Sequence, residues 1–140
     1  MCSHVNPYIF SRDCKAHLEW LRKVFDVEVG EMHYFKEDPK KIMHTCVKVQ
    51  NGGTVMMADY MPGTSEKCTS DRGSAISLQF ERGQGEKYWK KAIENGGTVE
   101  FKYEVQFWGS YFGSFVDPFG FTWMIVEMVP DAKETNQESK

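Results

Sequence analysis

The sequence lacks the long apolar segments that mark membrane proteins. Its apolar runs have the length of strands, whereas a membrane-spanning helix needs about 20 consecutive apolar residues. The N-terminus carries His4 and Asn6, where a secretory signal peptide would be apolar. We therefore expect a soluble, cytoplasmic protein with no membrane partner.

Charge of neither sign gathers in one part of the chain. The 17 basic and 20 acidic residues are interspersed and give a formal net charge of −3. A protein that binds nucleic acid usually presents a basic patch or stripe. The sequence therefore predicts no nucleic-acid partner.

Cysteines are few and are not arranged in pairs. The four of them, Cys2, Cys14, Cys46 and Cys68, include no CxxC pair. Structural zinc sites usually take closely spaced ligand pairs, and a chain of this size does not need disulfides to fold. We expect free thiols. A glycine-rich loop after the first strand is also missing, so no nucleotide cofactor is predicted.

The most informative segment present is an aromatic hairpin. Residues 107–127 read FWGSYFGSFVDPFGFTWMIVE, with a turn at Asp117-Pro118-Phe119-Gly120. Proline fixes φ near −65° and glycine tolerates positive φ, so we expect Phe112 to Val116 to pair antiparallel with Phe121 to Glu127. The aromatic side chains either fill a core or line a ligand cavity with Trp108 at its rim. The sequence leaves both interpretations open.

Two halves of the chain show the same order of elements, one strand, one helix and then further strands. In the first half these are strand Val5 to Phe10, helix Cys14 to Phe25, and strands Val27 to Phe35, Ile42 to Val49 and Thr54 to Tyr60. In the second half they are strand Ala75 to Phe80, helix Glu86 to Glu94, strand Val99 to Tyr103 and the hairpin. The order starts again about 70 residues on, as Val5 and Ala75 show.

This pattern predicts one α+β domain over residues 1–130. Its tandem βαβββ modules, at 5–60 and 74–128, would form two curved mixed sheets around a cleft, with a linker at 61–73. Residues 131–140 lack apolar anchors and are expected to form a disordered polar tail.

Several segments resemble the vicinal oxygen chelate superfamily, which includes glyoxalase I, extradiol dioxygenases, and the bleomycin and fosfomycin resistance proteins. They are the element order, LRKVF at the end of the first helix, and DPFGFTWMI. VNPYIF, KIMH, GGTVMMAD and FWG look like its PhnB-like branch, and the likeness runs from about Val5 to Glu127. The resemblance implies the glyoxalase/bleomycin-resistance fold and a twofold homodimer.

The resemblance also locates four metal-ligand positions in this chain. They fall at or beside Asn6, near Met57, at Ala75 and at Met124. Methionine and alanine do not bind a hard divalent cation, and asparagine is a weak ligand. We therefore predict no metal site and no cofactor.

The remaining site candidates have structural alternatives. His44 is either a catalytic base or ligand partner facing the cleft, or a half-buried strand histidine. Asp59 is first a turn cap and second a site residue, while His4, His17 and His33 read as terminal or surface residues. Glu127, opposite Met124 by strand alternation, is expected to point outward.

Three function classes follow from these residues. The first is a metal-free binder of a small, largely apolar or aromatic molecule, with the ligand against Tyr8, His44, Met57, Gln79, Trp108 and Met124. The second is a metal-dependent or His44-dependent lyase, isomerase or dioxygenase, and the third is an interaction module. The sequence favours the first and leaves enzymatic activity open.

Overall fold

The computed structural model describes residues 4–49, 52–61, 63 and 73–127. The predicted tail 131–140, most of the predicted linker 61–73, Cys2 and Cys68 lie outside the described residues. The chain divides into two compact units, Met1–Arg72 and Gly73–Lys140.

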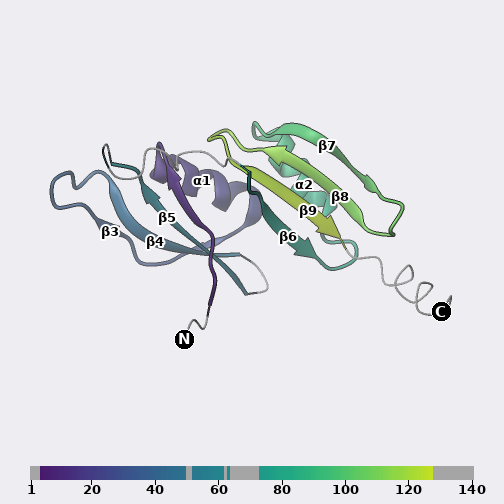
Figure 1. Ribbon diagram of the computed structural model, residues 1–140, viewed down its shortest axis with the longest axis horizontal. Coiled ribbons are helices and arrows are strands. Elements are labelled where there is room, and N and C mark those ends of the chain that lie inside the picture. Colours follow the sequence, from purple (N-terminus) through teal and green to yellow (C-terminus); the bar gives the residue numbers. More distant parts are fainter. Residues whose placement is uncertain (1–3, 50–51, 62, 64–72, 128–140) are drawn as a thin grey trace. The chain divides into compact units, whose positions relative to one another are not determined.

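The first unit is a mixed sheet with one helix against it (Figure 1). Its elements are β1 (Tyr8–Ser11), α1 (Cys14–Phe25), β2 (Glu28–Val29), β3 (His33–Tyr34), β4 (Ile42–Val49) and β5 (Gly53–Asp59). The strand order is β1-β5-β4-β2, and β3 also pairs with β4. Strand β1 runs parallel to β5, whereas the pairs with β4 are antiparallel.

Helix α1 forms where the sequence supplies both caps and an apolar stripe. The Asp13 carboxylate accepts the Ala16 N–H at 3.1 Å, and Asp26 ends the helix in the left-handed region at φ 52°. The buried residues of α1 include Leu18, Leu21 and Phe25, which recur at helical spacing. Burial of this stripe against the sheet stabilises the unit.

The Asp59 carboxylate, at the end of β5, accepts hydrogen bonds from two other elements. Its Oδ1 accepts the Cys14 N–H at the start of α1, and its Oδ2 accepts the Ile42 N–H at the start of β4, both at 2.8 Å. Asp59 is buried. Its role is therefore structural, but it acts at the starts of two other elements, where the sequence predicted the cap of a turn.

The second unit repeats the plan of the first. Its elements are β6 (Ile76–Phe80), α2 (Glu86–Glu94), β7 (Thr98–Val105), β8 (Tyr111–Val116) and β9 (Thr122–Glu127), with strand order β6-β9-β8-β7. The first strand again runs parallel to the last, and the others are antiparallel. The predicted α+β fold class, with two βαβββ modules that each build a mixed sheet, is confirmed.

The predicted hairpin is present, and a buried aspartate holds its turn. Gly120 has φ 93°. Asp117 accepts the N–H groups of Phe119 and Phe121 at 2.8 and 3.0 Å and the Trp123 indole N–H at 2.8 Å. The sequence identified the turn residues but did not predict that Asp117 also accepts the Trp123 indole N–H.

Two expectations about single residues were wrong. His17 is fully buried in α1, and its Nδ1 lies 3.1 Å from the Ser11 hydroxyl. Glu127 does lie on the other face of β9 from Met124, but that face is buried. There its carboxylate accepts hydrogen bonds from the Gly83 and Gly85 N–H groups and from the Tyr103 hydroxyl. Neither residue belongs to the surface.

One predicted strand is interrupted. The segment Val27 to Phe35 forms two short strands, β2 and β3, instead of one. The Gly30 N–H donates to the Cys46 carbonyl at 2.8 Å and continues the register of β2, in which Val29 pairs with Val47, whereas His33 pairs with His44, one residue out of that register. A register shift of this kind, a β-bulge, bends the strand and disrupts its hydrogen-bond ladder locally.

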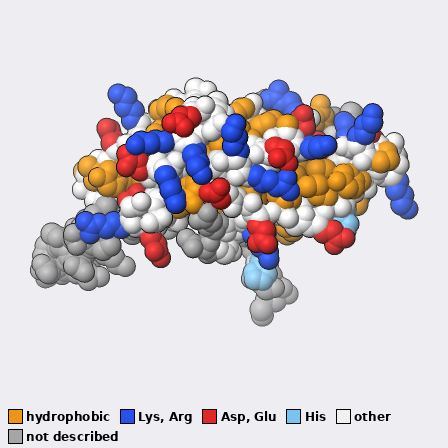
Figure 2. Space-filling model, turned by 180° about the vertical axis from the view of Figure 1, so that it is seen from behind, with side chains coloured by type: hydrophobic (Ala, Val, Ile, Leu, Met, Phe, Trp, Pro, Cys, Tyr) orange, Lys and Arg blue, Asp and Glu red, His pale blue; other side chains and the backbone are white. Residues whose placement is uncertain are grey.

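The described surface agrees with the interspersed charges of the sequence. On the face shown in Figure 2, basic and acidic side chains alternate with hydrophobic areas. Within the described residues, no helix is long and apolar enough to cross a membrane.

Candidate functional site

The structure fixes which strand residues face α1 and which lie on the open face of the first sheet. Met57 pairs with Ile9 and with Thr45, and all three are buried. Met56 pairs with Tyr8 and with Cys46, which are less buried. Because neighbouring strand residues point to opposite sides, Tyr8, Cys46 and Met56 share the open face.

Tyr8 and His44 form the centre of a polar and aromatic cluster on this open face. The Tyr8 hydroxyl lies 3.0 Å from His44 Nδ1, and the Cys46 thiol lies 3.7 Å from Nε2. Phe10 stacks on Tyr8 with ring centroids 4.7 Å apart, and His33 stacks on His44 at 6.4 Å. These five residues are called the Tyr8–His44 cluster below.

The cluster offers a hydrogen-bond donor at the protein surface. Burial raises the pKa of Tyr8, and the charges of Cys14 and Cys46 raise it further, so the hydroxyl stays protonated at neutral pH. Tyr8 is 41% exposed. With the imidazole proton on Nδ1, His44 donates to the Tyr8 oxygen and accepts at Nε2 from the Cys46 thiol, which leaves the Tyr8 O–H to donate to a ligand.

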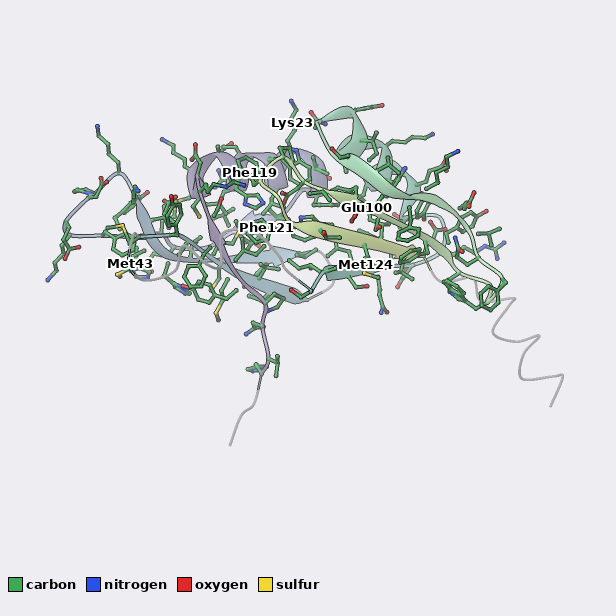
Figure 3. All side chains as sticks on the ribbon, turned by 45° about the horizontal axis from the view of Figure 1, so that its top comes forward. Lys23, Met43, Glu100, Phe119, Phe121 and Met124 are labelled. Carbon is green, nitrogen blue, oxygen red and sulfur yellow. The ribbon has the colours of Figure 1, made fainter. Side chains whose placement is uncertain are left out.

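The open face of the second sheet carries two of the predicted site residues. Leu78 and Phe80 are buried, and Phe80 stacks on Tyr88 of α2 at 4.9 Å, so they mark the helix side. Gln79 and Met124 therefore lie on the other side by alternation. Met124 is labelled on β9 in Figure 3.

An aromatic row continues this second open face. Gln79 pairs with Val126, and Val126 pairs with Phe112, so the three lie in line across β6, β9 and β8. The Trp108 ring meets the Phe112 ring edge-on, with centroids 6.3 Å apart. The Phe101 ring is tilted against the Phe112 ring, and these two centroids are also 6.3 Å apart. Trp108 is 49% exposed and is available to a ligand.

The structure thus brings together some predicted site residues and separates others. Tyr8 and His44 are in contact in the first unit, and Gln79, Met124 and Trp108 share one face of the second. Met57 is fully buried on the α1 side, and so it does not join the cluster. The reason is register, since Met57 lies opposite Thr45 and its neighbour Met56 lies opposite Cys46.

Sequence reasoning missed His33 as a member of the cluster, because it was interpreted as a surface residue only, and it also missed Phe10 and Cys46. Both lie two residues after a predicted member, Tyr8 and His44, on the same strand. Residues at i and i+2 of a strand point to the same face. That spacing was the signal that could have found them.

The residues at the four family ligand positions do not fit a hard divalent cation. Met57 faces α1, Met124 offers a thioether, and Asn6 and Ala75 precede the first strand of each unit. Within the described parts of the chain, no group of three or more His, Cys, Asp or Glu side chains comes close enough to hold a metal ion. A metal site needs three or four such ligands.

Comparisons with known proteins agree with this architecture. The sequence model described as the Glyoxalase/Bleomycin resistance protein/Dioxygenase superfamily matches residues 2–125. An uncharacterized protein of Mycobacterium bovis is 28% identical over 139 residues, which cover 96% of this chain and 87% of that protein.

Two solved structures illustrate the similarity of the fold. Protein PA1353 from Pseudomonas aeruginosa has a TM-score of 0.75 at 25% identity, with 91% of this chain and 98% of that chain covered. The PhnB protein from Bacillus cereus, described as a putative 3-demethylubiquinone-9 3-methyltransferase, has a TM-score of 0.71 at 14% identity, with 89% and 99% covered. The second similarity supports the fold alone.

Proposed function

Because the chain belongs to the glyoxalase/bleomycin resistance protein/dioxygenase superfamily, we propose that it uses an open sheet face to bind a small molecule, without a catalytic metal. The ligand we propose is an uncharged, largely aromatic compound that carries one hydrogen-bond acceptor. The observation that carries this proposal is the Tyr8–His44 contact at 3.0 Å on the sheet face opposite α1.

The chemistry of the cluster supports this ligand class. Small-molecule sites are mostly apolar, with a few polar groups that fix orientation. Here Phe10 and Met56 supply apolar surface, and the Tyr8 hydroxyl supplies a donor. The open face of the second unit has the same character, with Gln79 beside Met124 and the aromatic row.

Binding of Prodan, a neutral naphthyl ketone with environment-sensitive fluorescence, tests the proposal. The Tyr8→Phe variant loses the donor to the ketone, which contributes about 1 kcal/mol, so we expect its Kd to rise about fivefold. Tyr111→Phe is the matched control, because Tyr111 is 39% exposed and Tyr8 41%. Equal affinity of wild type and Tyr8→Phe for Prodan would contradict the proposal.

A second candidate function is catalysis that depends on His44. The position of the ring between a hydroxyl and a thiol favours it, since proton transfer needs partners within hydrogen-bond reach. Turnover of an α-carbonyl substrate that His44→Ala abolishes, while Prodan binding is retained, would support this function. Metal analysis of the active protein would then separate a metal-free reaction from a metal-dependent one.

The free thiols favour residence in a reducing compartment. Cys14 and Cys46 are both unpaired in the structure, and reducing compartments keep thiols in this state. We propose a cytoplasmic location, which cell fractionation tests.

A further inference from the structure

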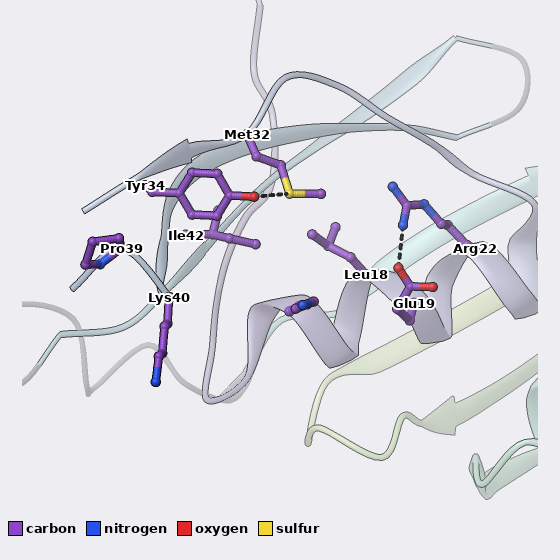
Figure 4. A pocket seen from close by; sticks show the side chains of 9 residues that line it. Leu18, Glu19, Arg22, Met32, Tyr34, Pro39, Lys40 and Ile42 are labelled. Carbon is purple, nitrogen blue, oxygen red and sulfur yellow. Dashed lines mark hydrogen bonds and ion pairs between the residues drawn. The ribbon is translucent and has the colours of Figure 1, made fainter. Parts of the chain in front are cut away.

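A groove in the first unit is separate from the Tyr8–His44 cluster. It lies between α1 on one side and the segment from Met32 to Ile42 on the other, and its volume is about 610 Å³ (Figure 4). None of the side chains that line it belongs to the cluster. Small-molecule sites typically enclose about 300–1,000 Å³, so the size fits one organic ligand.

The floor of the groove is apolar. Leu18 from α1 and Ile42 from β4 are each 1% exposed and close its base. Tyr34 forms an aromatic wall that is 50% exposed, and its hydroxyl donates to the Met32 sulfur at 3.5 Å. That contact sets the position of the ring and leaves its face available for an apolar or aromatic group.

The charges around the groove do not cancel. Glu19 and Arg22 form an ion pair with each other, so they contribute little net charge. Lys15 and Lys40 also line the groove and are exposed. The charges at the groove are therefore positive on balance, also when the Asp38 carboxylate at the Lys40 N–H is counted, in a chain whose formal net charge is −3.

The segment that carries Lys40 is held in a defined conformation. The Asp38 carboxylate accepts the Lys40 N–H at 3.2 Å, and the Asp38 carbonyl accepts the Lys41 N–H at 2.9 Å. The Phe35 N–H donates to the Lys41 carbonyl at 3.1 Å and closes the loop. A turn organised in this way keeps Lys40 beside the groove before any ligand binds.

We propose that this groove binds an amphipathic organic anion. An aromatic or acyl body would lie on Leu18, Ile42 and Tyr34, and a carboxylate or sulfonate would lie between the lysines. This ligand class differs from the neutral one proposed for the cluster, and the two sites share no residue.

Two fluorescent probes with the same body and different charge test the inference. ANS is an anilinonaphthalene with a sulfonate, and N-phenyl-1-naphthylamine lacks the sulfonate. In the double variant Lys15→Gln, Lys40→Gln we expect the Kd for ANS to rise about three- to tenfold, because each exposed ion pair contributes modestly. The Kd for the neutral probe should change less than about twofold, since apolar contacts do not depend on the lysines.

The double variant Lys87→Gln, Lys90→Gln is the matched control. Both of these lysines are exposed on α2, and their loss changes the net charge by the same amount. An equal loss of ANS affinity in this control, or none in the Lys15 and Lys40 variant, overturns the proposal. Tyr8→Phe should leave ANS binding unchanged, and a loss there would assign the anion to the cluster and also overturn it.

Tyr34→Ala tests the apolar wall. We expect weaker binding of both probes, about three- to tenfold, because an aromatic contact surface is lost. Thermal unfolding of the variant shows whether the fold is intact. Unchanged affinity for both probes in a folded Tyr34→Ala protein overturns the assignment to this groove, while the Prodan result at Tyr8 is unaffected.

Discussion

Two carboxylates, Asp59 and Glu127, occupy the same place in the two units. Each ends the last strand of its unit and pairs with the last residue of the first strand, Ser11 and Phe80 respectively. Each accepts hydrogen bonds where its helix begins, Asp59 from the Cys14 N–H and Glu127 from the Gly83 and Gly85 N–H groups. The N-cap residue of α2 is Gly85, which has no side chain that could accept a hydrogen bond. The Glu127 carboxylate therefore caps this helix.

We expect Glu127→Gln to lower the free energy of unfolding by about 1–3 kcal/mol at pH 7. The glutamine amide nitrogen cannot accept the bonds that Gly85 and Tyr103 now donate to Oε2. Urea denaturation measures the loss. Glu81→Gln, at an exposed glutamate before the same helix, is the control and should have little effect.

The difference in unfolding free energy between wild type and Glu127→Gln depends on pH with a definite sign. Burial acts to raise the pKa of Glu127, but the bonds from Gly83, Tyr103 and Gly85 and the charge of Arg82 outweigh it and lower the pKa below the ordinary 4.5. The stabilisation is therefore complete above about pH 5 and is lost as the pH falls through the folded-state pKa. A gap between wild type and Glu127→Gln that stays constant from pH 7 to pH 3 would refute this account.

Burial of single residues was the hardest property to predict. His17 lies three residues after Cys14 and four before Leu21 on the stripe that α1 buries, so helical spacing contained the signal. Its polarity concealed that signal, because the partner that makes burial tolerable, Ser11, lies on another element. The face that His44 and Gln79 occupy also depended on strand register, which the sequence does not specify alone.

At the scale of elements, the sequence predicted most of what formed. The bounds of α1, α2 and β4 agree with those expected. Local residues mark one end of each helix, Asp13 before α1 and Gly96 with φ 98° after α2. The division of the predicted strand Val27 to Phe35 did not follow from local residues. It reflects a register shift against β4, since Gly30 lies opposite Cys46 in the register of β2 and His33 pairs with His44, one residue out of that register.

The hairpin of β8 and β9 provides an element-scale prediction. Gly120→Val is expected to cost about 1–3 kcal/mol of stability, since a β-branched residue is strained at the φ of 93° that the turn uses. Gly53→Val is the matched control. Gly53 does not have positive φ, and a Cβ there would meet nothing within 4 Å, so thermal unfolding should show little change.

At the scale of the whole molecule, edge strand β7 is a candidate interface between two copies of the chain. It pairs only with β8 among the described strands, and its residues are nearly all exposed. Val99, Phe101 and Val105 are 42%, 65% and 57% exposed. A long edge strand with apolar side chains is a ready site for pairing with another chain, and most soluble oligomers are symmetric dimers.

We therefore predict a homodimer at micromolar concentration that uses β7. Sedimentation should show a species of about twice the 16.2 kDa chain mass. Phe101→Glu should shift it to the monomer, because a charge would then be buried in the interface without a partner. Phe107→Glu, at a residue that is 98% exposed outside β7, should leave the dimer intact. A single 16.2 kDa species for wild type across this concentration range would exclude the dimer, and a dimer that both variants preserve would exclude β7 as its interface.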